Sequence, residues 1–509
     1  MNYLGVNLEY LARSSTADGR LFLDFDAIFG NDSGEDENPK ILAGYFVELQ
    51  SFKKAYDKTR QLEIVKARKG MGKSALLSHL KYRLTEDTKP LDPGAVVVKV
   101  TGNELMGLGD FSGKDSSLLE NKWKQVICKR ITMEIANQIG FAVSDDNMSL
   151  IEAAEIEGYK GRNLVSSLTA RLGAILENAS KSMSNGTIAL KPTNPTDPKT
   201  LGYEHILRRI QDSSDRTVWL LIDDIDAKFM DTPELQARIG AFFSAIRSLA
   251  FSVEGLRVRA SVRTDVWTNL RGMEDQDKLR QYVTDIKWTD DHLKKIFAKR
   301  ILSYLQRDSD TLYLNWNEND DYKRITDEVF HGDFRLHSEK KADPLMVAIM
   351  LAGRRPRWMG QLCKLAGAAA GIILIQQKHF NEVMSSFGRE KISDLIKEHQ
   401  HQFSDIQKVI DSFRSSEKTN NRFKLISLLD KGFVNKLGKE NVPEVNGFPF
   451  QNTDQIIELL FEIDFIVGEK NGRQTPYHED PTLFRCEANL QNKIPWVVNL
   501  SYRSFLNIN

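Results

Sequence analysis

The chain has 509 residues, and its 70 basic and 70 acidic residues give no formal net charge. A single hydrophobic core stops growing at about 250–300 residues, so we expect two or three domains. Hydrophobic residues make up 41% and charged residues 28%, which excludes a disordered or collagen-like chain. The balanced charge excludes bulk attraction to nucleic acid or to an anionic membrane and leaves only local patches open.

The cysteines and the lengths of the apolar stretches indicate where in the cell the protein works. Cys128, Cys363 and Cys486 are too few and too far apart for a disulfide framework or a CxxC metal site, and they favour a reducing environment. The opening residues lack a secretion signal, and no stretch gives about 18–20 consecutive apolar residues. We therefore expect a cytoplasmic protein with no membrane association.

Apolar periodicity predicts alternating strands and helices over residues 41–285, after an N-terminal extension over residues 1–40. Helices are expected at 45–56, 74–84, 123–139 and 235–250, strands at 61–67, 95–100, 217–222 and 256–262, and a polar excursion at about 179–202. Strands that are apolar on both faces are typical of parallel sheets covered by helices. The fold class predicted here is α/β, with a parallel sheet flanked by helices.

From Thr289 onward the pattern is mostly helical, with helices expected at 293–305, 346–352 and 358–376. We interpret residues 286–400 as a helical lid domain. Beyond them, helices at 423–430 and 453–462 precede two short strand candidates at 465–467 and 496–500. Helices followed by a hairpin indicate a winged-helix-like domain over residues 401–509.

The sequence A-R-K-G-M-G-K-S matches a phosphate-binding loop, with alanine in place of its first glycine. The glycines let backbone N–H groups wrap phosphates, and the helix that begins at Lys73 directs its positive end at them. Lys73 would reach the β- and γ-phosphates, and Ser74 would coordinate Mg²⁺. We expect ATP, with Mg²⁺, to be bound by Ala67, Arg68, Lys69, Gly70, Met71, Gly72, Lys73, Ser74 and Ala75. A chance match on a loop is the competing interpretation, but the strand before it and the helix after it argue against chance.

Carboxylates follow the apolar run Val218–Ile222, about 150 residues after the loop. We predict that Asp223 coordinates Mg²⁺ through water and that Asp224 polarises the attacking water. Asp226 competes for the second role. The alternative is an apolar strand that ends in an acidic turn without function.

Two arginines are candidates for contacting the nucleotide. Arg263 ends the next predicted strand, and the carboxyl ends of parallel strands meet at the ligand crevice, so its charge suits the γ-phosphate or the transition state. Its alternative role is a structural pair with Asp265 or Asp223. Arg357 lies just inside a predicted helix that begins after G-R-R-P and is our candidate sensor, with a solvated basic turn or a nucleic-acid patch as the alternative.

Together these segments resemble the AAA+-related signal-transducing P-loop ATPases of the STAND and KAP-like kind, over roughly residues 40–380. The resemblance is carried by residues 44–48, 68–74, 221–226, 262–267, 288–289 and 355–357. It implies that Arg263 and Arg357 contact the nucleotide, and that the protein acts in bacterial defence against phage beside a separately encoded effector. Ala67 departs from the family pattern, and so does Asp224, where many relatives have glutamate. The shorter carboxylate leaves the hydrolysis rate open.

Three functions remain to be weighed. We favour a regulatory switch ATPase that forms a homo-oligomer and acts through a protein partner. The alternative is a DNA-acting ATPase of initiator or loader type with a winged helix on duplex DNA. The zero net charge counts against it, although Lys299 and Arg300, or basic residues from Arg414 to Lys431, would supply a local basic face. The third is a nucleotide-binding scaffold without hydrolysis.

Overall fold

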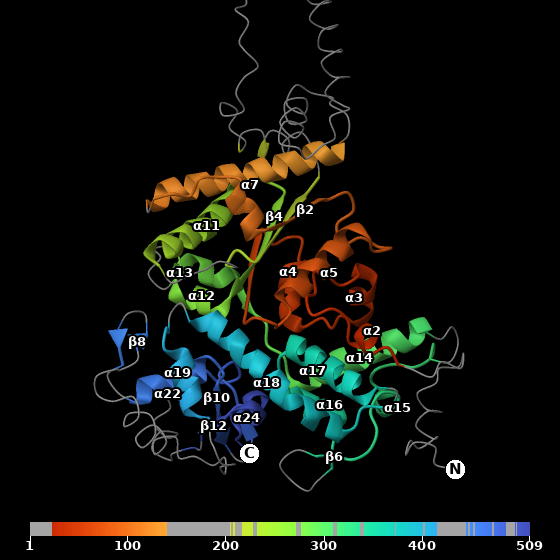
Figure 1. The fold of residues 1–509 in the computed structure, drawn as a ribbon. Helices are drawn as coiled ribbons and strands as arrows, with labels where there is room; N and C mark the ends of the chain where they lie inside the picture. The colour runs from red at the N-terminus through yellow and green to blue at the C-terminus, as the bar shows by residue number, and fades with distance from the viewer. Residues whose placement is uncertain are drawn as a thin grey trace, which may run out of the picture. The chain divides into compact units, whose positions relative to one another are not determined.

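A computed structural model gives the fold of the chain (Figure 1). It describes residues 23–113, 115–139, 216–226, 232–270, 276–308, 313–335, 341–371, 373–400, 403–414, 453–470, 473–484 and 496–508, with shorter pieces at 204, 207–208, 444–445, 448–450 and 494. The excursion predicted at 179–202, the helix predicted at 423–430 and the basic residues Lys418, Arg422, Lys424 and Lys431 lie outside these residues.

The chain divides into two compact units. The sheet unit contains residues 51–66 and 80–284, and the helical unit contains residues 1–50, 67–79 and 285–509. The predicted phosphate-binding loop is therefore grouped with the helical unit, although the strand before it belongs almost entirely to the sheet unit.

The sheet unit is built on a five-stranded parallel sheet in the order β2-β3-β4-β1-β5. Its strands are β1 (Leu62–Ala67), β2 (Val96–Thr101), β3 (Val218–Asp223), β4 (Leu256–Arg263) and β5 (Val283–Asp285). In the parallel register Val100 lies opposite Ile222, which lies opposite Ala260. The α/β class and the four predicted strands are confirmed within about one residue at each end. β5 was not predicted, because a strand of three residues is too short to show a hydrophobic period.

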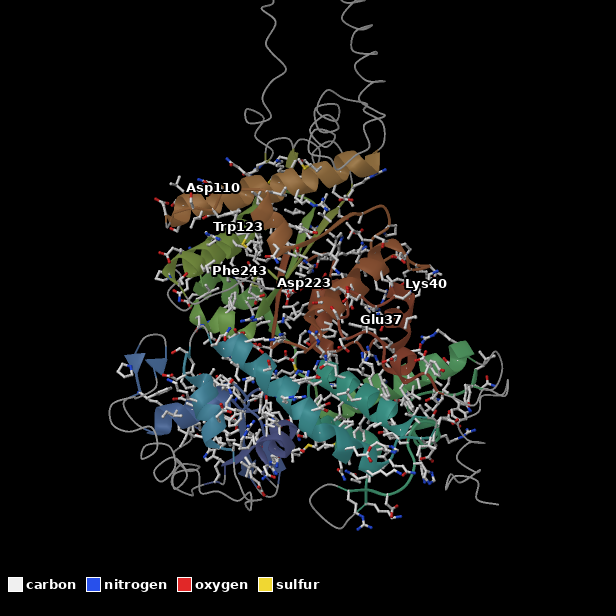
Figure 2. The ribbon with its side chains drawn as sticks, viewed as in Figure 1. Glu37, Lys40, Asp110, Trp123, Asp223 and Phe243 are labelled. Carbon is white, nitrogen blue, oxygen red and sulfur yellow. The ribbon has the colours of Figure 1, made fainter. Side chains whose placement is uncertain are left out.

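Both faces of the sheet are buried, because alternate residues of each strand meet different helices. Val98, Leu220 and Val258 share a core with α7 (Ser116–Ile139) and α11 (Pro233–Ser252), which lie together on one side of the strands in Figure 1. Trp123 and Phe243, labelled in Figure 2, belong to this layer. On the opposite face Trp219 and Leu221 pack with the later turns of α5 (Lys73–Thr85).

The sheet unit's remaining elements are short. They are a 3₁₀ turn at Gln50–Phe52, α4 (Lys53–Tyr56), α6 (Gly102–Gly107), α12 (Thr264–Asn269), α13 (Gln276–Leu279) and a 3₁₀ turn at Arg280–Tyr282. α6 follows β2 directly and begins with a reciprocal cap, in which Thr101 accepts from the Glu104 backbone and Glu104 accepts from the Thr101 backbone.

The helical unit packs its helices around α14 (Asp290–Asp308) and α17 (Pro356–Ala370). α14 contacts α2 (Phe25–Phe29), α3 (Pro39–Tyr45) and α16 (Pro344–Leu351), while α18 (Gln377–His399) contacts α17 and α24 (Leu500–Leu506). A three-stranded antiparallel sheet in the order β11-β10-β12 completes it, from β10 (Ile466–Lys470), β11 (Arg473–Thr475) and β12 (Trp496–Val498). Its other elements are α15 (Tyr322–Asp327), α19 (Ile406–Ser412), α22 (Thr453–Glu462), and the pairs β6 (Phe334–Arg335) with β7 (Lys341–Ala342) and β8 (Glu444–Val445) with β9 (Phe448–Pro449).

Three helix predictions were wrong in extent, and one of them, the helix expected at 123–139, begins seven residues earlier, at Ser116. The helix expected at 45–56 is broken, because α3 ends at Tyr45 and the chain stays extended from Phe46 (φ −61°, ψ 134°). Val47 and Leu49 are buried with exposed Glu48 between them, so the apolar residues here follow a strand-like period that coincides with helical spacing. The helix expected at 358–376 ends at Ala370, because Gly371 takes a positive φ of 67°.

No helix in the described part of the chain combines the length and apolar character needed to cross a membrane.

A buried arginine ties the segment before β1 to β4. Arg259 is fully buried, and its guanidinium donates to the carbonyls of Ala55 (2.7 Å), Asp57 (2.7 Å) and Arg60 (3.0 Å). It also lies 4.7 Å from the centre of the Trp219 ring. Burial lowers the pKa of Arg259 to about 9.

We expect Arg259→Met to destabilise the protein by at least about 1–3 kcal/mol, because it leaves buried carbonyls without a donor. Arg257→Met is the matched control, since Arg257 is on the same strand but its bond to the Lys58 carbonyl (2.6 Å) is exposed. Urea unfolding of both variants measures the difference. Equal midpoints for the two variants would show that the Arg259 bonds contribute nothing beyond those of a surface arginine.

Candidate functional site

The predicted phosphate-binding loop has the backbone that its glycines allow. β1 ends at Ala67, α5 begins at Lys73, and between them Gly70 and Gly72 have φ angles of 79° and 94°. These positive values favour glycine over any residue with a Cβ. The Lys73 ammonium donates to the carbonyls of Ala67 (3.3 Å) and Arg68 (3.4 Å), so its buried side chain curls back over its own loop. The predicted order of strand, glycine loop and helix is confirmed.

Residues from the helical unit hold this loop from outside. The Trp288 indole N–H donates to the Met71 carbonyl at 2.9 Å, and its ring lies 3.8 Å from where a Cβ on Gly72 would be. The backbone N–H of Arg357, in the first turn of α17, donates to the Gly70 carbonyl at 3.3 Å. A Cβ on Gly70 would lie 3.2 Å from the Cβ of Arg357. The loop and the start of α17 are therefore in direct contact.

Arg354, Arg355 and Arg357 lie at the start of α17, and they differ in their partners. Arg354 is paired with Asp290 (2.8 Å) and Glu479 (3.2 Å). The Arg357 guanidinium makes no hydrogen bond or ion pair with any residue that the structure describes. Asp32, which interacts electrostatically with Arg357, is itself bound by Gln361 (2.7 Å) and Lys364 (2.5 Å). Arg357 is thus a half-buried cation beside the loop that is available to a ligand.

Arg68 is occupied by the protein itself. Its guanidinium is paired with the Asp464 carboxylate, donates to the Glu462 carbonyl and lies 5.2 Å from the centre of the Tyr477 ring. Asp464 is buried and is also paired with Arg355 at 3.4 Å. Burial alone would raise the pKa of Asp464, but Arg68, His478 and Arg355 together hold this pKa well below its usual range.

The remaining loop residues differ in exposure. Lys69 is exposed at the tip of the loop, while Ser74 and Ala75 are half-buried in the first turn of α5. Gly34 packs against this turn, since a Cβ on Gly34 would lie only 2.6 Å from the Cβ of Ala75.

In the sheet unit, Asp223 lies fully buried at the end of β3 (Figure 2). Its Oδ1 accepts from the Ser261 hydroxyl at 2.5 Å and from the Asp224 backbone N–H at 3.0 Å. Its Oδ2 is buried and accepts from no group in the described residues. An unpaired carboxylate oxygen fits a metal ion or metal-bound water. Within the described part of the chain no group of three His, Cys, Asp or Glu residues is arranged to hold a metal, so any ion at Asp223 needs hydroxyl, phosphate or water ligands as well.

The turn after Asp223 has a constrained backbone. Asp224 is half-buried and adopts a left-handed conformation, with φ 50°. A Cβ on Gly102 would lie 2.4 Å from the Ile225 Cα and 2.8 Å from the Asp224 carbonyl oxygen, so only glycine fits there. Gly102 and Ser261 were not among the predicted site residues. Their only signals were a glycine directly after a predicted strand and a lone small polar residue in an apolar strand.

Asp226 and Arg263 are engaged with neighbouring residues. Asp226 is buried and accepts the Arg263 backbone N–H at 2.5 Å. The Arg263 side chain binds Asp265, with Nε 3.2 Å from Oδ1 and a second contact to Oδ2. Of the structural partners considered from the sequence, Arg263 therefore pairs with Asp265. Because Asp226 is turned to β4, Asp224 is the more accessible of the two candidate bases.

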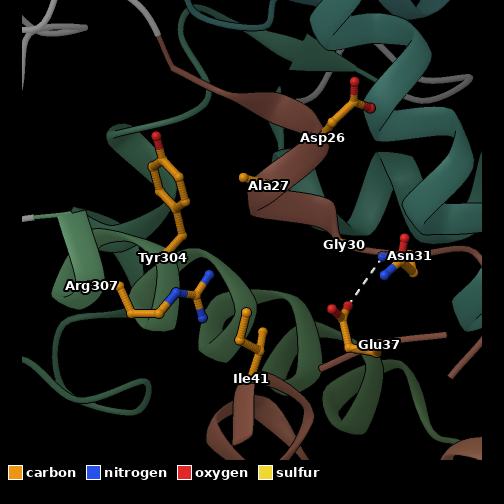
Figure 3. A pocket seen from close by; sticks show the side chains of 8 residues that line it. All are labelled: Asp26, Ala27, Gly30, Asn31, Glu37, Ile41, Tyr304 and Arg307. Carbon is orange, nitrogen blue, oxygen red and sulfur yellow. Dashed lines mark hydrogen bonds between the residues drawn. The ribbon is translucent and has the colours of Figure 1, made fainter. Parts of the chain in front are cut away.

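The helical unit also contains a pocket of about 440 Å³ between α2, α3 and α14 (Figure 3). Asp26, Asn31, Glu37, Ile41, Tyr304 and Arg307 line it. Glu37 accepts the Asn31 backbone N–H at 3.1 Å, and Arg307 donates to the Ser303 hydroxyl at 2.8 Å. None of the predicted site residues lines this pocket.

A scan against protein-family models finds no match to the chain, and a search of curated proteins finds none either. The function must therefore be inferred from the residues and their geometry.

We expect Asp464→Asn to lower the free energy of unfolding by about 3–5 kcal/mol at pH 7, because it leaves the buried Arg355 and the half-buried Arg68 without their carboxylate. Since the folded-state pKa of Asp464 is lowered, its contribution is present above the unfolded pKa of about 3.9 and is lost as the pH falls below it. The difference between wild type and variant should shrink between about pH 5 and pH 2.

Urea unfolding at several pH values measures this difference. Asp405→Asn is the control, because Asp405 is paired only with the exposed Lys408 in the described structure and should change stability by less than about 0.5 kcal/mol. A difference between wild type and Asp464→Asn that stays constant with pH would contradict the assignment.

Proposed function

We propose that the chain is a Mg²⁺-dependent P-loop ATPase, related to the AAA+, STAND and KAP-like ATPases. The observation that carries this proposal is the glycine loop, with its two positive φ angles, beside the guanidinium of Arg357, which has no partner among the residues that the structure describes. Backbone N–H groups in such a loop favour phosphate, and a half-buried arginine favours the phosphate charge that distinguishes ATP from ADP. Residues Ala67 to Ala75 would hold the phosphates. Lys73 would exchange its hydrogen bonds to the Ala67 and Arg68 carbonyls for bonds to the phosphate oxygens.

The carboxylates support a metal-dependent reaction. Ser74 and Asp223 would hold Mg²⁺, which would neutralise charge developing on the phosphates. Asp223 Oδ2, which has no partner within the described part of the chain, supports this role. Asp224 would orient and deprotonate the attacking water, and Arg263 would supply positive charge only if it leaves Asp265.

We propose that α14 to α18 act as a lid that closes over the nucleotide, with Arg357 as its sensor. The elements α22, β10, β11, β12 and α24 would form the winged-helix-like part. Arg68 and Arg355 share Asp464, so both the loop and the lid helix are tied to this part. Such ties suit a switch, in which the state of the nucleotide is transmitted to a partner.

In this proposal the protein works in the cytoplasm as a homo-oligomer and controls a separately encoded effector, as part of a defence against phage. No observation on the described residues specifically favours the alternative, a DNA-acting ATPase. Lys299 is paired with Glu318 at 3.8 Å, Arg300 donates to the Phe29 carbonyl and to Tyr45, and Arg414 lies over the Phe505 ring. These basic groups are engaged within the protein, and the others named for DNA binding lie outside the described residues.

Calorimetric titration with ATP and ADP tests nucleotide binding. We expect Lys73→Ala and Arg357→Ala to weaken ATP binding by about 10–100-fold, the range for losing one charged hydrogen bond. Arg357→Ala should weaken ADP binding less, since we assign Arg357 to the γ-phosphate. Arg389→Ala is the control, because Arg389 is exposed on α18.

The same samples, sized with and without ATP and Mg²⁺, report assembly. Assembly that depends on ATP and disappears in Lys73→Ala supports the switch. Tight binding of duplex DNA at moderate salt would favour the DNA-acting function, and no response to any nucleotide would contradict both.

Asp224→Asn should reduce phosphate release by about 10²–10⁴-fold while ATP affinity is retained, because it removes the general base and leaves the loop unchanged. Asp226→Asn is the comparison. It should instead reduce stability, since it removes the negative charge of a buried carboxylate that lies 3.9 Å from Arg263 Nε and accepts the Arg263 backbone N–H. Phosphate release at saturating ATP measures both variants. Undiminished turnover in Asp224→Asn would exclude Asp224 as the base, and no turnover in wild type would leave a binding scaffold.

A further inference from the structure

A single hydroxyl on β4 fixes the orientation of the Asp223 carboxylate. Ser261 is fully buried, and its Oγ lies 2.5 Å from Asp223 Oδ1. The parallel register pairs Ile222 with Ala260, so Asp223 and Ser261 are the next residues along the two neighbouring strands. Asp224 completes the arrangement, because its backbone N–H is shared between Asp223 Oδ1 (3.0 Å) and Ser261 Oγ (3.3 Å).

This geometry determines the direction of each hydrogen bond. The Asp224 backbone N–H can only donate, so Ser261 Oγ accepts from it. The one hydroxyl proton of Ser261 is then given to Asp223 Oδ1, whose other contact is also a donor. Oδ1 is therefore satisfied twice, while Oδ2 of the same carboxylate is buried and has no partner in the described structure.

An unpaired carboxylate oxygen in a protein interior is costly and calls for a ligand. The two hydrogen bonds to Oδ1 hold the carboxylate in this orientation. Both donors therefore bind Oδ1, and neither binds Oδ2. This is the pattern by which residues behind a metal ligand orient it and leave its other oxygen for the metal.

We propose that Ser261 is a positioning residue for the metal site. By occupying Asp223 Oδ1 it presents Oδ2 to Mg²⁺ or to a water bound to Mg²⁺. Ser261 does not touch the nucleotide in this proposal, and it acts only through Asp223. The inference rests on the proposed function, because it assigns Asp223 to the magnesium ion that accompanies ATP.

The test is the Mg²⁺ dependence of ATP affinity, measured by calorimetry on the full-length protein with Mg²⁺ and with EDTA. Loss of a residue that orients a metal ligand typically costs about 10–100-fold in metal affinity. In Ser261→Ala the gain in ATP affinity given by Mg²⁺ should fall by about that factor, while the affinity in EDTA stays at the wild-type value. Ser261→Thr keeps the hydroxyl and should restore the gain. Ser261→Cys, a weak donor, should fall between alanine and serine.

A merely structural hydroxyl gives a different result. Thr132→Val is the control, because Thr132 is a fully buried hydroxyl in α7 that donates to the Lys129 carbonyl at 2.9 Å. It should lower stability without changing the Mg²⁺ dependence. If Ser261→Ala does not fold, the cysteine variant decides: a wild-type gain from Mg²⁺ overturns the proposal, and a reduced gain supports it.

The variant Asp223→Asn distinguishes failure of the proposed function from failure of the role assigned to Ser261. If wild type binds ATP equally well with Mg²⁺ and with EDTA, the metal site of the proposed function is wrong. If Mg²⁺ strengthens wild-type binding and Asp223→Asn abolishes this gain, but Ser261→Ala retains it, the proposed function stands and the role of Ser261 is overturned.

Discussion

A single buried carboxylate, Asp464, holds the glycine loop to the rest of the helical unit. It binds Arg68 in the loop and Arg355, the residue directly before α17. Two segments that are 287 residues apart in the chain therefore share one anion. Arg357, two residues further on, then lies against Gly70. Glycines alone permit many loop conformations. This charge cluster, together with the hydrogen bonds from Trp288 to Met71 and from the Arg357 backbone to Gly70, holds the loop in one of the conformations that its glycines permit.

Three aspartates within four residues acquire different chemistry from their partners. Asp223 is buried with one oxygen satisfied, Asp224 is half-buried on a left-handed backbone, and Asp226 is buried against the backbone of β4. The sheet produces these differences, because Ser261 and Arg263 on the neighbouring strand face two of the three. The difference in their surroundings is thus a property of strand pairing and cannot be assigned from the acidic turn alone.

This limit explains what the sequence could predict. Strands β1 to β4 were found because each is an apolar run bounded by turn or loop residues, and the loop was found because its signature is local. β5 was missed because three residues show no periodicity, and the segment after Tyr45 was misread because Val47 and Leu49 fit two periods at once. Ser261, Gly102 and the pair of Arg68 with Asp464 depend on register or on contacts across the fold, which one sequence does not encode locally.

The bond between Trp288 and the loop gives the protein an optical reporter. Its indole N–H donates to the Met71 carbonyl, and its ring borders Gly72, so the polarity and hydrogen bonding that determine indole emission are set by the loop backbone. The chain has seven tryptophans, and Trp123 and Trp219 are fully buried in the sheet unit with their own acceptors, Arg238 and Asp92. A change in the glycine loop is therefore readable in the intrinsic fluorescence of the unlabelled protein, through one residue that touches it.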